Sequence, residues 1–165
     1  MELGSTKPFD FEEACVRREE LRRAGRMVVL TNGCFDLLHA GHLHSLENAK
    51  KFGDSLWVAV NSDASVKKLK GKDRPIFGEQ VRAHMLSALA IVDGVFIFHA
   101  LRLADEIFRF KPDIYVKSGD YDMGKLDPLE RKALSQVGAQ IHFVPILDGF
   151  STTSIIEKIR QMENH

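Results

Sequence analysis

The 165-residue chain contains only two cysteines, one tryptophan and no excess of charge of either sign. Cys15 and Cys34 lie far apart and form no Cys-x-x-Cys pair, which argues against a disulfide framework and a zinc knuckle. The 23 basic residues balance the 23 acidic ones, whereas a nucleic-acid binder needs a dominant basic face. We therefore expect no nucleic-acid partner, and any phosphate site must be local.

Targeting and membrane segments are also missing from the sequence. The first residues, 1–4, lack the basic and apolar regions of a signal peptide. No apolar run approaches the roughly 20 residues that a membrane span needs. We expect a cytoplasmic protein that does not bind membranes.

Several common phosphate-binding and hydrolase motifs are absent. None of the 12 glycines forms a Gly-x-Gly pair, so the dinucleotide-binding fingerprint is missing, and so is the Walker A loop. The sequence contains neither a His-Glu-x-x-His zinc motif nor a Gly-x-Ser-x-Gly elbow. Metalloprotease and α/β-hydrolase activities therefore lose their main support, and phosphate must be held in another way.

Apolar, β-rich runs alternate with amphipathic helical segments along the whole chain. Residues 10–24 have helical spacing that ends at Gly25, and residues 27–30 form a continuous apolar run, typical of a strand covered on both faces. The pattern predicts further strands at residues 56–60, 95–98, 114–116 and 141–144, and helices at about residues 41–52, 79–91, 102–110, 127–137 and 152–163.

This alternation predicts an α/β fold. We expect a Rossmann-like, open, five-stranded parallel sheet of order 3-2-1-4-5 with helices on both faces. No linker divides the chain, so residues 1–165 should form a single domain, with an N-terminal helix within residues 1–25. Ligands of such sheets bind at the carboxyl ends of the strands, where the strand order reverses.

The segment that follows the first predicted strand carries the main functional signal. Gly33 permits a tight turn with exposed backbone N–H groups, and Gly41 lets a helix start close to a ligand. Such a helix N-terminus is an anion site. His39 and His42 are three positions apart, so both imidazoles can point toward the same spot. Alternatively, His39 caps the turn and His42 is an ordinary helix residue, but the combination of features favours a polyphosphate site.

A second, hydroxyl-rich segment follows the fifth predicted strand, at residues 151–154. Ser154 with Glu157 matches a capping box, which is a structural explanation. Capping requires only one hydroxyl, so the remaining hydroxyl and N–H groups could bind a second phosphate position. Both interpretations stay open.

Residues 67–74 carry five cations and one acid. Such a run is more often a solvated surface than a site. Gly71 and Pro75, however, place the later cations in a loop after the second strand, where a mobile lid could close over a triphosphate. Arg82, at the start of the next helix, could orient a phosphorylated substrate or could simply pair with Glu79.

The end of the fourth predicted strand offers a fourth candidate, residues 117–121. Backbone groups at Gly119 and the ring of Tyr121 could read and stack a base. The alternative is a plain turn in which Asp120 bonds its own backbone.

The segments 33–42 and 151–153 resemble the cytidylyltransferase-like nucleotidyltransferases, whose hallmarks are His-x-Gly-His after the first strand and a Ser-Thr-Thr-like motif that opens the last helix. The match narrows to the nucleotidyltransferase half of the bacterial ADP-heptose synthases, over roughly residues 26–160, through the segments 60–66, 69–71, 74–76, 116–121 and 149–156. Ser118 stands where that family usually has glycine. The sugar-kinase half of the fused enzymes is not in this sequence, so a separate protein is expected to phosphorylate the heptose.

The resemblance implies transfer of AMP from ATP to D-glycero-β-D-manno-heptose 1-phosphate, giving ADP-heptose and pyrophosphate for surface glycans such as lipopolysaccharide. The acceptor phosphate would attack the α-phosphorus in line, with no protein nucleophile. The same two motifs would serve a CTP-dependent cytidylyltransferase acting on glycerol 3-phosphate or phosphoethanolamine. A non-catalytic nucleotide-binding module is disfavoured by the intact His39, His42 and Thr152 and by the full basic run.

The resemblance also assigns roles to residues. His39, His42 and Lys70 are expected to be catalytic. Asp36 and Arg82 are placed on the acceptor side, and Mg²⁺ is expected to accompany ATP, held more by phosphate and water than by carboxylates, with no metal site of the protein's own. Related enzymes imply a homodimer. The nucleotide is assigned to Asn32, Gly33, Cys34, Phe35, Gly41, Gly119, Asp120, Tyr121, Ser151, Thr152 and Thr153.

Overall fold

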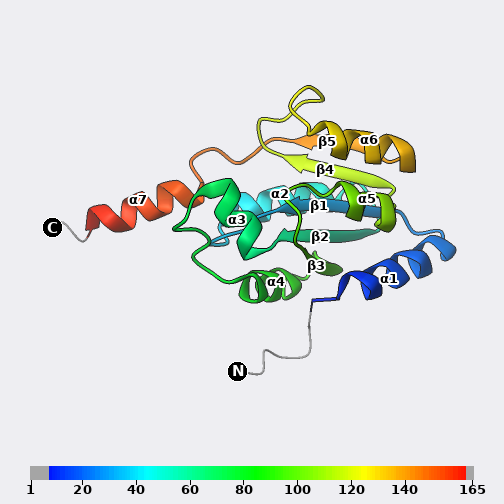
Figure 1. Cartoon of the computed structure of the whole chain (residues 1–165), viewed down its shortest axis with the longest axis horizontal. Helices are drawn as coiled ribbons and strands as arrows, with labels where there is room; N and C mark the ends of the chain where they lie inside the picture. Colours follow the sequence, from blue (N-terminus) through cyan, green and yellow to red (C-terminus); the bar gives the residue numbers. More distant parts are fainter. Residues whose placement is uncertain (1–7, 163–165) are drawn as a thin grey trace.

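The computed structural model describes residues 8–162 and confirms the predicted sheet. Five parallel strands lie in the order β3-β2-β1-β4-β5 (Figure 1). All seven residues of the second strand are buried, as expected for a strand covered on both faces. The strands are β1 (Val28–Gly33), β2 (Ser55–Asn61), β3 (Gly94–Phe98), β4 (Ile114–Ser118) and β5 (Gln140–Val144).

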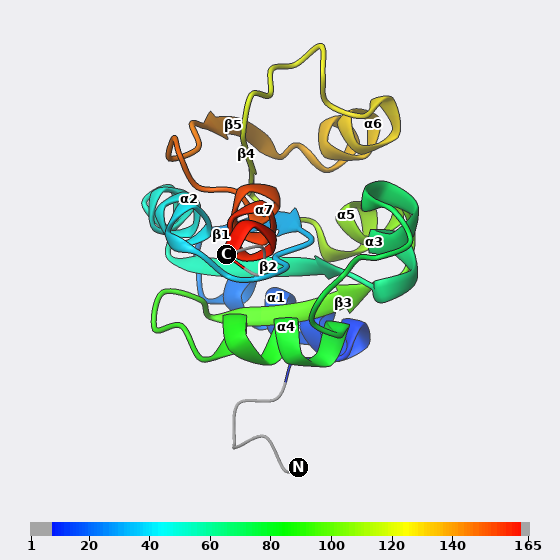
Figure 2. The same ribbon diagram turned by 90° about the vertical axis from the view of Figure 1, so that its left-hand side faces the viewer.

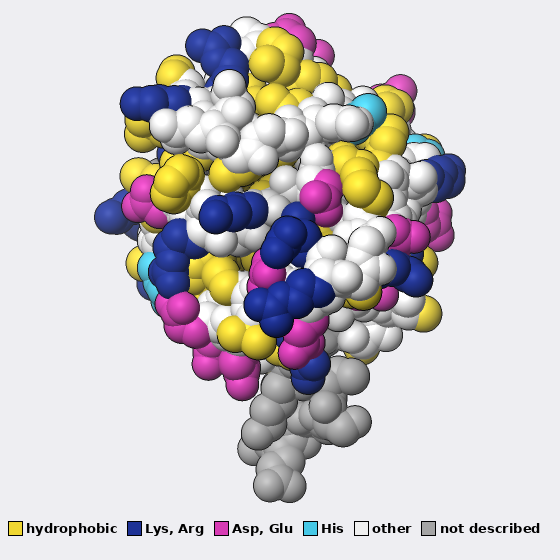
Figure 3. Space-filling model, turned by 90° about the vertical axis from the view of Figure 1, so that its right-hand side faces the viewer, with side chains coloured by type: hydrophobic (Ala, Val, Ile, Leu, Met, Phe, Trp, Pro, Cys, Tyr) yellow, Lys and Arg dark blue, Asp and Glu magenta, His cyan; other side chains and the backbone are white. Residues whose placement is uncertain are grey.

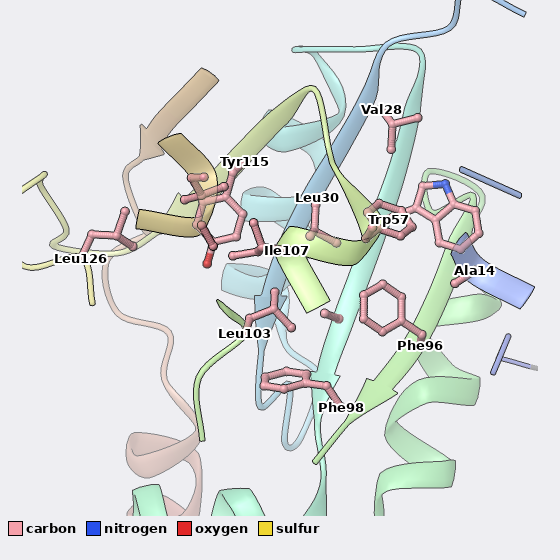
Figure 4. Close-up of a cluster of buried hydrophobic side chains, with 14 residues drawn as sticks. Ala14, Val28, Leu30, Trp57, Phe96, Phe98, Leu103, Ile107, Tyr115 and Leu126 are labelled. Carbon is pink, nitrogen blue, oxygen red and sulfur yellow. The ribbon is translucent and has the colours of Figure 1, made fainter. Parts of the chain in front are cut away.

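Helices cover both faces of the sheet, also as predicted, with α2 on one side and α5 and α6 on the other (Figure 2). The core on the α5–α6 side is rich in aromatic rings, among them Trp57, Phe96 and Tyr115 (Figure 4). The core on the α2 side is mainly aliphatic. The helices are α1 (Phe11–Arg23), α2 (Ala40–Lys50), α3 (Asp63–Lys70), α4 (Glu79–Ser87), α5 (Ala104–Phe110), α6 (Pro128–Val137) and α7 (Thr152–Met162).

The prediction was wrong about the segment after β2. The first part of the basic run belongs to a helix that was not predicted, α3, whose N-cap Ser62 accepts a hydrogen bond from Ser65 N. The helix ends at Gly71, which has a φ of 104° and therefore suits a residue without a side chain. The later cations, from Lys72 on, follow this helix in a loop, as predicted. Part of the predicted N-terminal region, residues 1–7, and residue 163 of the predicted last helix lie outside the described residues.

The last helix has an unusual position. It projects away from the body of the molecule (Figure 1), and none of its residues is buried. Only its start lies over the sheet, at the carboxyl ends of the strands (Figure 2). No helix within residues 8–162 is both long and apolar enough to cross a membrane.

The opposite end of the sheet carries side chains of both charge signs (Figure 3). There, Arg22 and Arg23 at the end of α1 pair with Glu19, at 2.7 and 3.0 Å. Arg26 lies 3.8 Å from Asp54. Exposed pairs of this kind each contribute little to stability, so the charged groups that matter most for the fold and the site lie elsewhere.

Candidate active site

A cavity of about 480 Å³ opens at the carboxyl ends of β1 and β4, which are neighbours in the sheet. This is the point at which the strand order reverses, where ligands of open α/β sheets bind. The starts of α2 and α7 and the end of α3 form its walls. Two helix N-termini therefore converge on one cavity, and the positive end of each helix dipole favours a bound anion.

His39 and His42 both line this cavity and also cap α2. Nδ1 of His39 accepts a hydrogen bond from Gly41 N at 3.1 Å, and Nδ1 of His42 accepts one from His39 N at 3.4 Å. Because both Nδ1 atoms act as acceptors, the proton of each neutral ring is on Nε2. The two rings stack with their centroids 3.8 Å apart. The two interpretations of the pair, as helix caps and as ligand-binding residues, are therefore compatible. In each ring Nδ1 caps the helix, and Nε2–H remains as a donor for a ligand.

Burial keeps both rings uncharged at neutral pH. It lowers the pKa of His39, and burial together with the neighbouring His39 lowers the pKa of His42 to about 4. A neutral Nε2–H group can donate a hydrogen bond to an anion, and it places no uncompensated charge in the buried cavity wall. A bound polyphosphate would favour protonation of the same rings.

The low pKa of His42 predicts a pH dependence of stability. The unfolded chain takes up a proton near pH 6.5, while the folded protein resists it down to about pH 4. The free energy of unfolding should therefore fall as the pH drops through this window, by on the order of 2–3 kcal/mol. Urea unfolding between pH 8 and pH 4 measures it. His42→Asn keeps an acceptor near the Nδ1 position but cannot titrate, and an identical pH profile for this variant would contradict the assignment.

Gly41 is required by close packing. A Cβ at this position would lie 3.0 Å from the His39 ring and 3.2 Å from Cβ of Phe150. The absence of a side chain thus lets the His39 ring fold back over the first turn of α2. It also lets the segment before α7 approach α2, which brings the two helix starts to the same cavity.

Ser151 caps α7, whereas the sequence suggested Ser154 with Glu157. Ser154 N donates to Ser151 Oγ at 3.0 Å, and Ser151 N donates to Ser154 Oγ at 3.3 Å. Thr152 Oγ1 donates to the carbonyl of Asp36 at 2.6 Å, which ties α7 to the loop between β1 and α2. Since the Ser151 and Thr152 hydroxyl protons are used within the protein, backbone N–H groups and the Thr153 hydroxyl are the donors left for a phosphate.

Asp36 lies in the cavity wall, but its carboxylate is already hydrogen-bonded within the protein. The side chain is fully buried and accepts from Ile76 N, Phe77 N and Arg74 Nε. Burial alone would raise the pKa of Asp36, but the two backbone N–H groups and Arg74 outweigh it and hold the pKa below its usual value. Asp36 thus fixes the loop after α3 above the site.

Arg82 lies outside the cavity wall, and its suggested pairing with Glu79 does not form. Its side chain is completely buried and does not line the cavity. The guanidinium donates to the carbonyls of Phe77, Cys34 and Asn61, and to Asp63 at 2.8 Å. Arg82 therefore joins the ends of β1 and β2 to α4, and these contacts give it a structural role.

The remaining predicted residues fall into two groups. Gly119 and Asp120 do not line the cavity, and Asp120 instead pairs with Lys125 at 2.7 Å. Tyr121 does line it, with its ring 5.3 Å from the Lys117 ammonium. All other predicted site residues lie in the cavity wall: Asn32, Gly33, Cys34, Phe35, Asp36, His39, Gly41, His42, Lys70, Ser151, Thr152 and Thr153.

Of the basic run, Lys70 and Arg74 reach the cavity, and Arg74 is already paired with Asp36. Sequence reasoning assigned no role to three charged wall residues, Arg102, Lys117 and Glu130, although Lys117 begins the candidate segment 117–121. The position of Lys117 was the one signal that could have indicated a role for it. Lys117 stands at the end of a central strand, two residues after Tyr115, and alternate residues of a strand share a face.

No group of three His, Cys, Asp or Glu side chains within residues 8–162 is arranged to hold a metal ion. The cavity wall contains two carboxylates, Asp36 and Glu130, and both are buried and hydrogen-bonded within the protein. A divalent cation would therefore have to be held mainly by the phosphates of a substrate.

The fold and the site together define a nucleotidyltransferase, an enzyme that moves a nucleotidyl group between phosphates. A family model described as cytidylyltransferase-like matches residues 30–158. The chain belongs to this cytidylyltransferase-like family.

Curated relatives share the name "Bifunctional protein HldE". The protein from Koribacter versatilis is 50% identical over 137 residues, which cover 83% of this chain and 28% of the relative. The protein from Campylobacter jejuni is 43% identical over 163 residues, which cover 96% of this chain and 34% of the relative. The chain thus spans about a third or less of the length of these relatives.

Solved structures agree with the family. The lipopolysaccharide core biosynthesis protein from Thermoplasma volcanium matches with a TM-score of 0.61 and 32% identity, covering 74% of this chain and 98% of that one. Pantoate-beta-alanine ligase from Francisella tularensis matches with a TM-score of 0.59 and 14% identity, which indicates a shared fold alone.

Proposed function

We propose that the protein transfers AMP from ATP to D-glycero-β-D-manno-heptose 1-phosphate, giving ADP-heptose and pyrophosphate. The observation that carries this proposal is the convergence of the α2 and α7 N-termini, with the two Nε2–H donors, on one cavity. That arrangement suits a triphosphate. The choice of acceptor is supported by the relatives named HldE, at 43–50% identity, and by the lipopolysaccharide core biosynthesis protein.

The reaction needs positioning and charge stabilisation more than it needs a protein nucleophile. An oxygen of the sugar phosphate attacks the α-phosphorus, the new P–O bond forms, and the bond to the β-phosphate oxygen breaks as pyrophosphate leaves. His39, His42 and Lys70 would stabilise the charge that develops on the α-phosphate and the departing pyrophosphate. Burial raises the pKa of the Cys34 thiol, so this cysteine stays protonated beside the reaction. Mg²⁺ would enter as part of the nucleotide substrate.

A coupled pyrophosphate assay with purified protein tests the function. We expect pyrophosphate from ATP only when heptose 1-phosphate is added, and ADP-heptose as the second product. CTP with glycerol 3-phosphate or phosphoethanolamine forms the comparison set, because the same cavity would serve a cytidylyltransferase. Pyrophosphate in that set alone would replace the heptose proposal, and none in either set would favour a non-catalytic nucleotide-binding module.

Lys70 provides a second test. It ends α3 and lines the cavity, whereas Lys67 and Lys68 lie on the same helix outside the cavity wall. Lys70→Ala should lower kcat by about 10- to 100-fold while nucleotide binding weakens less, because the charge matters most in the transition state. Lys67→Ala is the matched control and should keep the normal rate. A loss confined to nucleotide affinity would make Lys70 a binding residue only.

A further inference from the structure

We propose that the phosphate of the acceptor binds Lys117, in a part of the cavity that we call the acceptor lobe; the proposal rests on nucleotidyl transfer to a phosphorylated acceptor. The acceptor lobe is the wall formed by Asn32, Asn61, Leu101, Arg102, Lys117 and Glu130. The sequence analysis placed Asp36 and Arg82 on the acceptor side, but the charged groups of both are hydrogen-bonded within the protein. We assign acceptor binding to the acceptor lobe instead.

The acceptor lobe lies across the end of the sheet from the histidines. Tyr115, two residues before Lys117 on β4, packs in the core on the α5–α6 side, and Leu30 stands in the same relation to Asn32 on β1. Alternate residues of a strand share a face, so Lys117 and Asn32 point to that side. The helix that carries His39 and His42 packs on the other side. One cavity thus has two chemically different walls.

In-line transfer requires such an arrangement. The attacking oxygen and the leaving pyrophosphate must lie on opposite sides of the α-phosphorus. The Nε2–H groups of His39 and His42 and the N-terminus of α7 offer the donors for the leaving pyrophosphate. The acceptor must therefore approach from the other wall, which is the acceptor lobe.

The ammonium group of Lys117 has an N–H donor available for an anion in the acceptor lobe. Its side chain is only 14% exposed, and its ammonium donates to Asn32 Oδ1 at 2.9 Å and to Tyr115 OH at 3.3 Å. Oε2 of Glu130 is 3.8 Å away, beyond hydrogen-bond distance. An ammonium has three N–H donors, so one is left for a ligand in the cavity.

The neighbours of Lys117 are fixed as well. Asn32 Oδ1 accepts from both Tyr115 OH, at 2.8 Å, and Lys117, so its amide N–H groups are left for the ligand. Glu130 Oε1 accepts from Leu103 N at 3.0 Å. Arg102 is half exposed at the rim and pairs with Asp127 at 3.1 Å. The Lys117 ammonium beside the Glu130 carboxylate suits a phosphate that is joined to a hydroxyl-bearing body, because an ammonium donates to phosphate oxygens and a carboxylate accepts from hydroxyls.

The test separates phosphate binding from the transfer reaction. The protein is first saturated with Mg²⁺ and α,β-methylene-ATP, which cannot release pyrophosphate, and inorganic phosphate is then titrated by calorimetry. Lys117→Met should weaken phosphate binding by about 10- to 100-fold, the effect of losing a charged hydrogen bond, and change the affinity for the nucleotide analogue by less than about threefold. Lys125→Met, which removes an exposed lysine paired with Asp120, is the control and should behave like the wild type.

Unchanged phosphate binding in Lys117→Met, or an equal loss of nucleotide binding, would overturn the proposal. Lys117→Gln keeps a polar side chain and gives the same comparison if Lys117→Met does not fold. With any acceptor that the enzyme uses, the same variants should raise KM for the acceptor more than KM for the nucleotide. Phosphate binding is measured without turnover, so the two proposals fail in different ways. A wrong acceptor identity abolishes transfer to heptose 1-phosphate but leaves the effect of Lys117→Met on phosphate binding. A wrong acceptor lobe removes that effect.

Discussion

Replacing His42 with alanine should lower kcat for nucleotidyl transfer by about 10²- to 10³-fold, the cost of removing one donor that stabilises transition-state charge. The Nδ1 atom of this ring accepts from His39 N, so Nε2–H is the donor that faces the cavity. In the transition state the α-phosphate oxygens and the leaving pyrophosphate gain charge. KM for the nucleotide should change much less, because the donor acts mainly at that stage.

Two further substitutions at position 42 separate catalysis from capping. His42→Asn keeps an acceptor near Nδ1 but has no donor at Nε2. Its kcat should be as low as that of His42→Ala, while its free energy of unfolding should be closer to that of the unchanged protein. His42→Gln places an amide N–H near the Nε2 position and should restore part of the rate. His44→Ala, on the same helix but outside the cavity wall, is the matched control. An unchanged rate in His42→Ala would make His42 a capping residue only.

Replacing Arg82 with methionine should lower the free energy of unfolding by about 3–5 kcal/mol, the range for breaking a buried charged network. The side chain is completely buried, and three backbone carbonyls with one carboxylate accept from it. Methionine fills most of the volume but leaves those carbonyls without a donor, and an unsatisfied buried acceptor is costly. Urea unfolding at pH 7 measures the change.

The same variant distinguishes a structural role from substrate binding. Arg109 provides the control, because it is half exposed and pairs with Glu12 at the surface. Arg109→Met should leave the free energy of unfolding close to that of the unchanged protein, because exposed ion pairs contribute little. If Arg82→Met folded with nearly normal stability but showed a raised KM for the acceptor, Arg82 would be a substrate-binding residue after all.

The sheet and its covering helices could be predicted because their signals are local. The apolar runs of β1 to β5 and the periodicity of the longer helices lie in short stretches of sequence, and the alternation limits the sheet to few topologies. The missed helix, α3, has eight residues and ends in a cluster of lysines. The sequence analysis did not predict this helix, because eight residues give only a short amphipathic pattern and the lysines make most of its last turn polar.

The sequence by itself determined the strands, the His39 and His42 pair after the first strand and the hydroxyl-rich start of the last helix, because each depends on neighbours within a few positions. The alternation of strands and helices then limited the sheet order to few topologies. Tertiary structure alone decided how Asp36, Arg82 and Lys117 are used. Arg82 bonds to Cys34, 48 positions away, and Lys117 bonds to Asn32, 85 positions away. Whether a charged side chain is free for a substrate depends on which distant partners already satisfy it, and only the folded chain brings those partners together.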